Sequence, residues 1–190
     1  NRFITKQRWN LRQLNAIRLK ECLHERTGGI LSLDDTLIEK TGKTMGGVGY
    51  LYDSTQKKNI LCHDIVSTFY RNSSAEQLPL YFEPYVKQEV AENSDIWFHT
   101  KIQIALDLLR QSLAQVTPAA VVFDEWYMSQ EVTEFLASYG ITWVSQAKIN
   151  RYIQVGEAWV SLSTYVRSLP VKAFSRVNAE VEEKRCKWFF

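Results

Sequence analysis

The sequence predicts a mixed α/β fold, and three observations lead to this expectation. Apolar residues recur at helical spacing over residues 10–23 and again over residues 100–113. A run rich in β-branched and aromatic residues covers residues 59–70 and predicts a long strand. From residue 100 onward the pattern alternates helix, strand, helix and strand, which is typical of parallel strands joined by a crossover helix. We therefore expect one mixed sheet flanked by helices.

The first half of the chain is expected to hold one amphipathic helix, a short buried strand, a loop and an antiparallel strand pair. In chain order, these elements cover residues 10–23, 30–33, 39–58, 59–70 and 78–86. Gly28 and Gly29 are expected to close the helix, because glycine adopts the positive φ of a helix C-cap without steric cost. The third segment is predicted to be a loop or an irregular hairpin because it is rich in glycine and lysine.

The second half is expected to hold two helices and two buried strands, followed by a β-rich segment. In chain order, these elements cover residues 100–113, 119–123, 129–139, 141–145 and 151–190. The strand at 119–123 is apolar throughout, as expected of a strand covered on both faces. Ser129 is a suitable N-cap for the second helix, and Gly140 marks its end.

Composition excludes several classes of protein. The chain has 190 residues, of which 45% are hydrophobic, so it can form one globular core but not two large domains. No apolar run approaches the roughly 18 to 20 residues that cross a bilayer, and the opening residues lack the apolar core of a signal peptide. A cytoplasmic protein without a membrane partner is expected. Three cysteines, far apart and without a C-x-x-C pair, predict neither a disulfide framework nor a zinc knuckle.

Charge is distributed unevenly along the chain. Residues 1–29 carry seven Lys or Arg against two Glu, a local charge of +5, so residues 30–190 sum to −3 because the whole chain carries +2. A basic segment of this kind contacts nucleic-acid phosphates or forms a solvated helix face, and both interpretations stay open. The initial Asn and the apolar run at 187–190 lead us to expect a fragment of a longer protein.

Carboxylates follow two of the predicted buried strands. Asp34 and Asp35 come after the strand at 30–33, and Asp124 comes directly after the strand at 119–123. If the two strands are neighbours, these acids converge at one edge of the sheet, where like charges raise each other's pKa unless a cation neutralises them. Mg²⁺ is suited to such a site because it prefers carboxylate and water ligands. The alternative is that the acids only cap strand ends or helix starts.

Several segments of the chain resemble the DDE transposases of bacterial insertion sequences. The resemblance is carried in this order by LSLDDTLIEKTGK at 31–43, GGVGY at 46–50, LCHDIVST at 61–68, TKIQIA at 100–105 and VVFDEWY at 121–127. It spans roughly residues 9–170, and the order of the segments makes it more specific than any single motif. The resemblance implies a ribonuclease H-like catalytic core that cuts and joins DNA with two divalent metal ions, Mg²⁺ with Mn²⁺ as a substitute.

The resemblance also assigns catalytic residues. The family's first aspartate precedes a threonine and corresponds to Asp35, with Asp34 as the alternative if the register differs by one residue. The second aspartate corresponds to Asp124, and Tyr127 takes the place of the family's tyrosine three residues later. The third acid, a glutamate on a late helix, has no match here. The implied domains are the end of an upstream DNA-binding region at 1–29, a partial catalytic core at 30–150 and the start of a β-rich insertion at 151–190.

The implied activity is DNA transposition. In the family mechanism, a metal-activated water attacks the phosphodiester at the transposon end, and the freed 3′-hydroxyl then attacks target DNA. The implied partners are transposon-end and target DNA and, for the full-length protein, a second copy in a homodimer, associated with the bacterial nucleoid. Two alternatives remain, namely a non-catalytic DNA-binding remnant, favoured by the missing third acid, and a ribonuclease H-like nuclease that only hydrolyses.

A few further residues have both a functional and a structural interpretation. Arg12, Arg18, Lys148 and Arg151 are candidates for contacts to DNA phosphates or for solvated surface positions. Trp126 stacks on an exposed base or packs in the core. His63, followed by Asp64, supports the site or contacts DNA, or its ring is held by a neighbouring backbone group.

Overall fold

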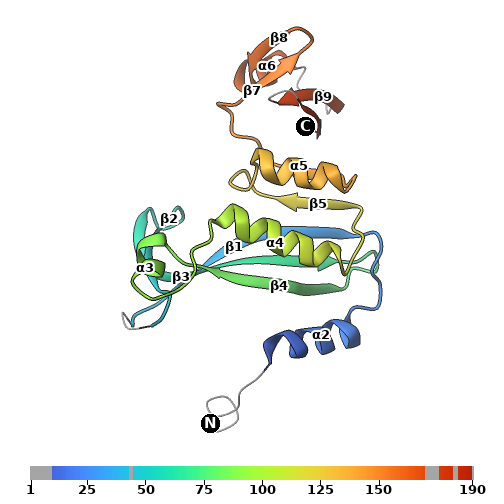
Figure 1. The fold of residues 1–190 in the computed structure, drawn as a ribbon. Helices are drawn as coiled ribbons and strands as arrows, with labels where there is room; N and C mark the ends of the chain where they lie inside the picture. The colour runs from blue at the N-terminus through green and yellow to red at the C-terminus, as the bar shows by residue number, and fades with distance from the viewer. Residues whose placement is uncertain (1–9, 43–44, 170–175, 182–183, 190) are drawn as a thin grey trace.

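A computed structural model describes residues 10–42, 45–169, 176–181 and 184–189. Its centre is a six-stranded mixed sheet, with helices packed along it and two small hairpins at the C-terminal end (Figure 1). The predicted mixed α/β fold is therefore confirmed. Arg2, Lys6 and Arg8 of the predicted basic segment lie outside the described residues.

The sheet combines antiparallel and parallel pairs. Its strands are β1 (Ile30–Glu39), β2 (Gly49–Asp53), β3 (Lys58–Arg71), β4 (Gln77–Tyr85), β5 (Ala120–Phe123) and β6 (Trp143–Ser145). β3 pairs antiparallel with β1, β2 and β4, which confirms the predicted antiparallel pair in this region. β5 pairs parallel with β6, as the alternating pattern predicts, and it also pairs parallel with β1. The strand order β2-β3-β1-β5-β6, with β4 also on β3, places β1 at the centre.

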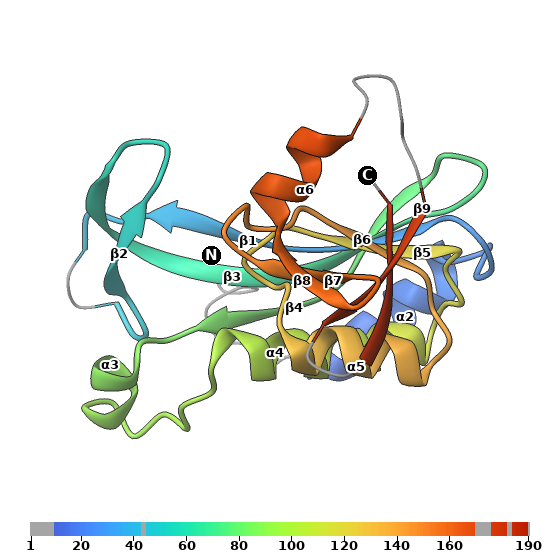
Figure 2. The ribbon, with the colours of Figure 1, turned by 90° about the horizontal axis from the view of Figure 1, so that it is seen from above.

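The predicted helices form and cover the sheet. They are α2 (Leu11–Cys22), α4 (Lys101–Leu113) and α5 (Gln130–Ser138). α4 begins with a capping box in which the Thr100 side chain accepts from the Gln103 N–H and the Gln103 side chain accepts from the Thr100 N–H. α5 begins at Ser129, whose side chain accepts from the Val132 N–H, as predicted. α4 and α5 lie on the same side of the sheet (Figure 2).

The core fills the space between the sheet and these helices. Alternate residues of β1 and β5, such as Leu31, Leu33 and Val121, point into it and are at most 1% exposed. Leu108 and Leu109 of α4 meet them from the helix side and are equally buried. This packing fixes which face of each strand turns toward the helices, and it therefore decides where each aspartate points.

The structure corrects several predicted boundaries. β1 does not stop before Asp34 but continues to Glu39, because its residues pair with β3 over its whole length. α2 ends at Cys22, with Leu23 as its C-cap, so Gly28 and Gly29 turn the connection to β1 and do not close the helix. The segment at 39–58 is the irregular hairpin alternative, since it contains β2.

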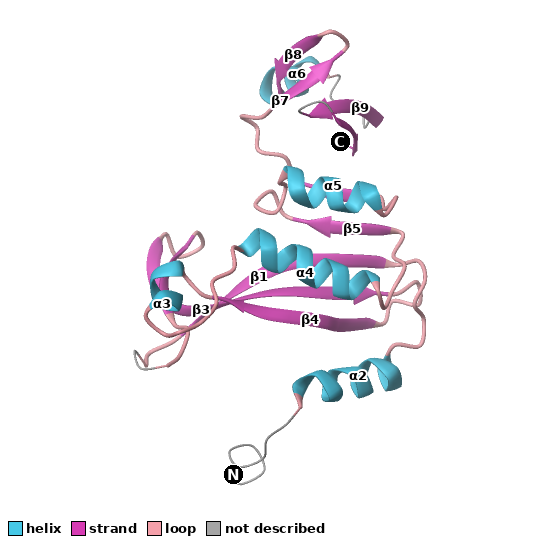
Figure 3. Cartoon of the chain, viewed as in Figure 1, coloured by secondary structure: helices cyan, strands magenta, loops and turns pink. Residues whose placement is uncertain are grey.

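The C-terminal part is less purely β than predicted. It holds β7 (Tyr152–Val155), β8 (Ala158–Ser161), β9 (Arg176–Val181) and β10 (Lys184–Phe189), in two antiparallel hairpins. A helix, α6 (Leu162–Ser168), separates the two hairpins, and a short α3 (Gln88–Glu92) follows β4; neither was predicted (Figure 3). None of the helices in the described part of the chain is long and apolar enough to span a membrane.

Candidate active site

The candidate acids lie on two neighbouring strands. β1 and β5 pair in parallel, with Leu33 opposite Phe123. The residue after each of these two is an aspartate: Asp34 is the next residue of β1, and Asp124 directly follows the end of β5. The expected convergence of the acids at one region of the sheet therefore occurs. It arises because the parallel pairing runs both strands in the same direction and in this register.

Asp34 and Asp35 point to opposite faces of the sheet. Successive residues of a strand alternate between its faces, and Asp35 shares the face of Leu31 and Leu33, against which the helices pack. Its side chain is 19% exposed, whereas Asp34 is an exposed residue on the other face. Asp124 lies just beyond the end of β5, so the strand pleat does not restrict its orientation. Asp34 and Asp35 therefore present their carboxylates to different faces of the sheet at the level where β5 ends.

Tyr127 connects Asp35 with Asp124. Its hydroxyl donates to Asp35 Oδ1 at 2.8 Å, and its backbone N–H donates to Asp124 Oδ1 at 3.3 Å. The N–H of Trp126 donates to the same Asp124 oxygen at 2.9 Å. The Tyr127 side chain is fully buried, so its position is set by packing. One tyrosine therefore holds two carboxylates that are far apart in the sequence.

Lys101 lies on the other side of Asp35. As the first residue of α4, it brings its Nζ to 2.8 Å from Asp35 Oδ2 and to 2.6 Å from Asp64 Oδ2. The ammonium also lies over two aromatic rings, 5.1 Å from the Trp126 centroid and 5.5 Å from the Tyr85 centroid. A single ammonium thus bridges two carboxylates inside an aromatic enclosure.

Asp64 is a buried carboxylate with few partners. Its side chain is 0% exposed, and neither of its oxygens has a well-oriented hydrogen bond. Its contact with Lys101, at 2.6 Å, is an ion pair. Burial raises the pKa of Asp64 to about 6, because Lys101 only partly offsets the loss of water. This carboxylate depends on Lys101 for its charge compensation.

The same contacts set the other pKa values in this network. Burial alone would raise the pKa of Asp35, but the Lys101 ammonium and the Tyr127 hydroxyl outweigh burial and lower this pKa. Burial would also lower the pKa of Lys101, yet the carboxylates of Asp35 and Asp64 raise it. Burial and the nearby Asp35 charge raise the pKa of Tyr127, so its hydroxyl stays protonated and remains a donor. Asp35 is accordingly a carboxylate and Lys101 an ammonium at neutral pH.

Asp34 has a different environment. Although this residue is largely exposed, partial burial of its carboxyl group and the nearby charges of Asp35 and Asp124 raise its pKa, against the hydrogen bond from the Asp35 N–H. Carboxylates supply the hard oxygen donors that a divalent cation prefers. In the described residues, however, no three His, Cys, Asp or Glu side chains are close enough together to form a ready metal site.

Two members of this network were not identified from the sequence as site residues. Asp64 was expected only as the neighbour of His63, and Lys101 had no assigned role. The strict alternation of buried and half-buried residues along β3 places Asp64 on the buried face, and a charged residue at such a position signals a partner. The identity of that partner depends on how α4 packs, which the sequence pattern does not contain.

The other predicted site residues are placed as follows. Arg12 and Lys148 are exposed. Two others hold the fold together, because the Arg18 guanidinium donates to the Leu80 carbonyl oxygen and the Arg151 guanidinium donates to that of Met128. Trp126 is 46% exposed and contacts the Tyr127 ring edge to face.

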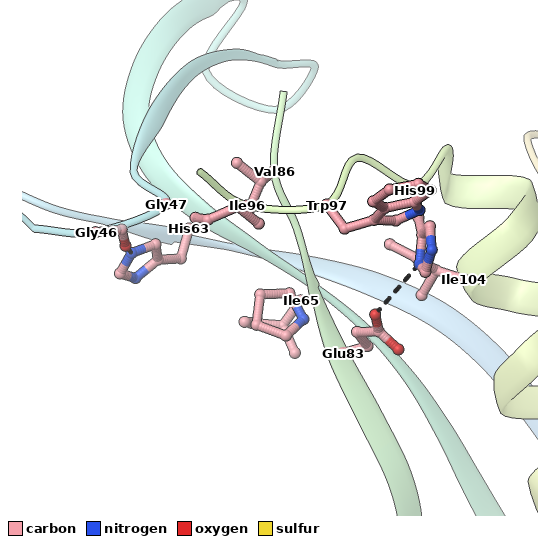
Figure 4. Close-up of a pocket in the computed structure, with 11 residues that line it drawn as sticks. Gly46, Gly47, His63, Ile65, Glu83, Val86, Ile96, Trp97, His99 and Ile104 are labelled. Carbon is pink, nitrogen blue, oxygen red and sulfur yellow. Dashed lines mark hydrogen bonds and ion pairs between the residues drawn. The ribbon is translucent and has the colours of Figure 1, made fainter. Parts of the chain in front are cut away.

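A hollow of about 430 Å³ opens between the loop after β1, the end of β4 and the segment before α4 (Figure 4). His63 lines it, and its Nε2 lies 3.0 Å from the Gly46 carbonyl oxygen, which is the backbone partner that the structural interpretation predicts. His99 and Glu83 point toward one another across it, with 3.8 Å between Nδ1 and Oε1. The titratable groups of the hollow are therefore engaged with protein partners.

Comparison with known proteins supports the resemblance found in the sequence. A family model described as DDE superfamily endonuclease matches residues 1–161. No curated protein matches the chain. The mixed sheet with flanking helices is consistent with the ribonuclease H-like fold of DDE proteins.

Proposed function

The chain belongs to the DDE superfamily endonucleases, and from this premise we propose that it forms part of the catalytic core of a transposase. Membership of this family indicates transposase-like nuclease activity, divalent metal ions as cofactors and DNA as the substrate. The proposed reaction is cleavage of DNA at transposon ends followed by strand transfer to target DNA. Mg²⁺ is the proposed ion, and a homodimer is the proposed assembly of the full-length protein.

One observation carries this proposal more than any other. Asp35 and Asp124 are both bound by Tyr127, through its hydroxyl and its backbone N–H respectively. Each contact leaves oxygen lone pairs free, because a carboxylate accepts about four hydrogen bonds in total. The two acids that the family resemblance selects are thus held together by a rigid, buried residue. Catalysis of phosphoryl transfer requires charged groups that are held in fixed positions.

The residues present fit a divalent cation. Asp35 and Asp124 would hold it, because Mg²⁺ is usually bound by one or two protein carboxylates together with waters. Asp34 faces the other side of the sheet, so it is an alternative to Asp35 and not a third donor to the same ion. The bound metal would supply an activated water and neutralise charge on the phosphodiester. Asp35 and Asp124 would orient the cation, and the two contacts of Tyr127 hold these carboxylates in place. The exposed side of Asp34 and Asp124 is open to a DNA strand.

Calorimetric titration with Mn²⁺ tests this site directly. We expect the parent chain to bind Mn²⁺, and we expect Asp35→Asn and Asp124→Asn to lose binding, since each substitution removes one anionic ligand while the shape is kept. Asp95→Asn is the matched control, because Asp95 is exposed and has a positive φ that asparagine also tolerates. Circular dichroism checks that all four proteins are folded.

The outcomes separate the candidate functions. Binding that is equal in all four proteins, or absent from all of them, would refute the metal site and favour a DNA-binding chain without catalysis. A second measurement, with plasmid DNA and Mn²⁺, distinguishes the two catalytic alternatives. Cleavage with strand joining supports a transposase, whereas cleavage alone supports a nuclease that only hydrolyses.

A further inference from the structure

Both oxygens of Asp35 are already engaged by the protein. Tyr127 donates to Oδ1, and the Lys101 ammonium lies 2.8 Å from Oδ2. Tyr127 is neutral, so its hydrogen bond leaves the negative charge of Asp35 available to a cation. Lys101 is different, because its ammonium neutralises that charge and occupies the position from which a cation would approach Oδ2.

An ammonium and a divalent cation cannot share one carboxylate without repulsion. Like charges a few ångströms apart repel strongly where water is partly excluded, and the Lys101 side chain is only 14% exposed. The Trp126 and Tyr85 rings further stabilise the ammonium where it lies. Metal binding at Asp35 therefore requires that the Lys101 ammonium move away from Oδ2 or that its ion pair with Asp35 weaken.

Asp64 offers the ammonium a second partner. Its Oδ2 lies 2.6 Å from the Lys101 Nζ, and no hydrogen bond in the described structure satisfies this fully buried carboxylate. A small movement of the ammonium away from Asp35 can thus keep the ion pair with Asp64. Without Asp64, the same movement would leave a largely buried ammonium with no carboxylate, which is costly.

We propose that Lys101 is a resident counter-ion that competes with the divalent cation for Asp35, and that Asp64 retains Lys101 when the cation binds. This inference rests on the proposed metal site. Lys101 and Asp64 are then positioning residues and not metal ligands. Lys101 compensates the negative charge of Asp35 until a cation binds. Lys101 and Asp64 together then set the cation concentration at which the site fills.

A cycle of four proteins tests the proposal, with the Mn²⁺ dissociation constant from calorimetry at one fixed pH as the readout. The four are the parent chain, Lys101→Met, Asp64→Asn and the double variant. We expect Lys101→Met to bind Mn²⁺ about tenfold or more tightly, because a competing charge is removed. We expect Asp64→Asn to bind more weakly, because Lys101 then depends on Asp35 alone. The double variant should match Lys101→Met, since Asp64 acts only through Lys101.

Other outcomes overturn the proposal in distinguishable ways. If the parent chain binds Mn²⁺ and Lys101→Met binds it equally or more weakly, Lys101 does not compete, and only this inference fails. If Asp64→Asn weakens binding in both backgrounds, Asp64 is a metal ligand and not the retaining partner. If none of the four proteins binds Mn²⁺, the proposed metal site itself fails and the inference fails with it.

Two controls keep the test decisive. Lys58→Met removes an exposed lysine at the start of β3, and it should leave the dissociation constant unchanged. Lys101→Met leaves Asp64 buried without a cation, so this protein can fail to fold. In that case the comparison of Asp64→Asn with the double variant measures the same effect of Lys101, because both proteins lack the buried charge at position 64. Tighter binding by the double variant supports competition, and equal or weaker binding overturns it.

Discussion

Replacement of Tyr127 by phenylalanine isolates the hydroxyl that holds Asp35. The Tyr127 side chain is fully buried, and phenylalanine keeps its ring and nearly all of its packing. The substitution removes only the 2.8 Å hydrogen bond to Asp35 Oδ1. Hydrogen bonds to charged groups contribute about 1.5–3 kcal/mol to stability, so we expect Tyr127→Phe to lower the free energy of unfolding by this amount.

The pH dependence of this effect follows from the pKa of Asp35. The Tyr127 hydroxyl helps to lower that pKa, so its contribution is present above the unfolded value of 3.8 and is lost as the pH falls through the folded value. We therefore expect the stability difference between the parent chain and Tyr127→Phe to be largest near neutral pH. It should shrink in acid, where Asp35 is protonated.

Urea unfolding, followed by circular dichroism at several pH values, measures this difference. Tyr139→Phe is the matched control, because Tyr139 is 52% exposed and its ring contact with Phe135 is kept by phenylalanine. A loss below about 0.5 kcal/mol for Tyr127→Phe, equal to that of the control, would refute the reasoning. A loss that does not change with pH would show that packing and not the Asp35 charge is responsible.

Three further predictions concern other parts of the chain. Burial raises the pKa of Asp64 from 3.8 to about 6, so its contribution to stability is complete below pH 4 and is lost as the pH rises through 6. The free energy of unfolding of the parent chain, measured with urea, should therefore decline by up to about 3 kcal/mol over this range, and Asp64→Asn should remove that decline. Arg12 is the predicted contact to a DNA phosphate, so Arg12→Gln should reduce the salt dependence of DNA binding, measured by fluorescence anisotropy, by about one counterion. The Arg18 guanidinium donates to a backbone carbonyl oxygen, so Arg18→Gln should instead lower the free energy of unfolding by about 1 kcal/mol. Iodoacetamide should modify exposed Cys22 much faster than buried Cys62, whose burial raises the thiol pKa, and peptide mass spectrometry that finds equal rates would contradict this.

The sequence pattern was most informative where the signal is local. Helical spacing and caps located α4 and α5, because Thr100 and Ser129 bind N–H groups within three residues of themselves. Boundaries that depend on partners were missed. β1 continues through Asp34 and Asp35 because β3 is long enough to pair with it as far as Glu39, and no local signal in β1 reports the length of β3.

For the candidate site, the sequence by itself determined that Asp34, Asp35 and Asp124 follow apolar strand residues. It predicted that these acids converge if the two strands are neighbours, but it left the pairing of the strands open. Only the tertiary structure decided which face each aspartate uses and what it meets there. Asp35 turns toward α4, and the first residue of that helix places Lys101 between Asp35 and Asp64. The physical reason is that secondary structure follows from interactions a few residues apart, whereas an ion pair between a helix and a sheet depends on how the buried core orients the two elements.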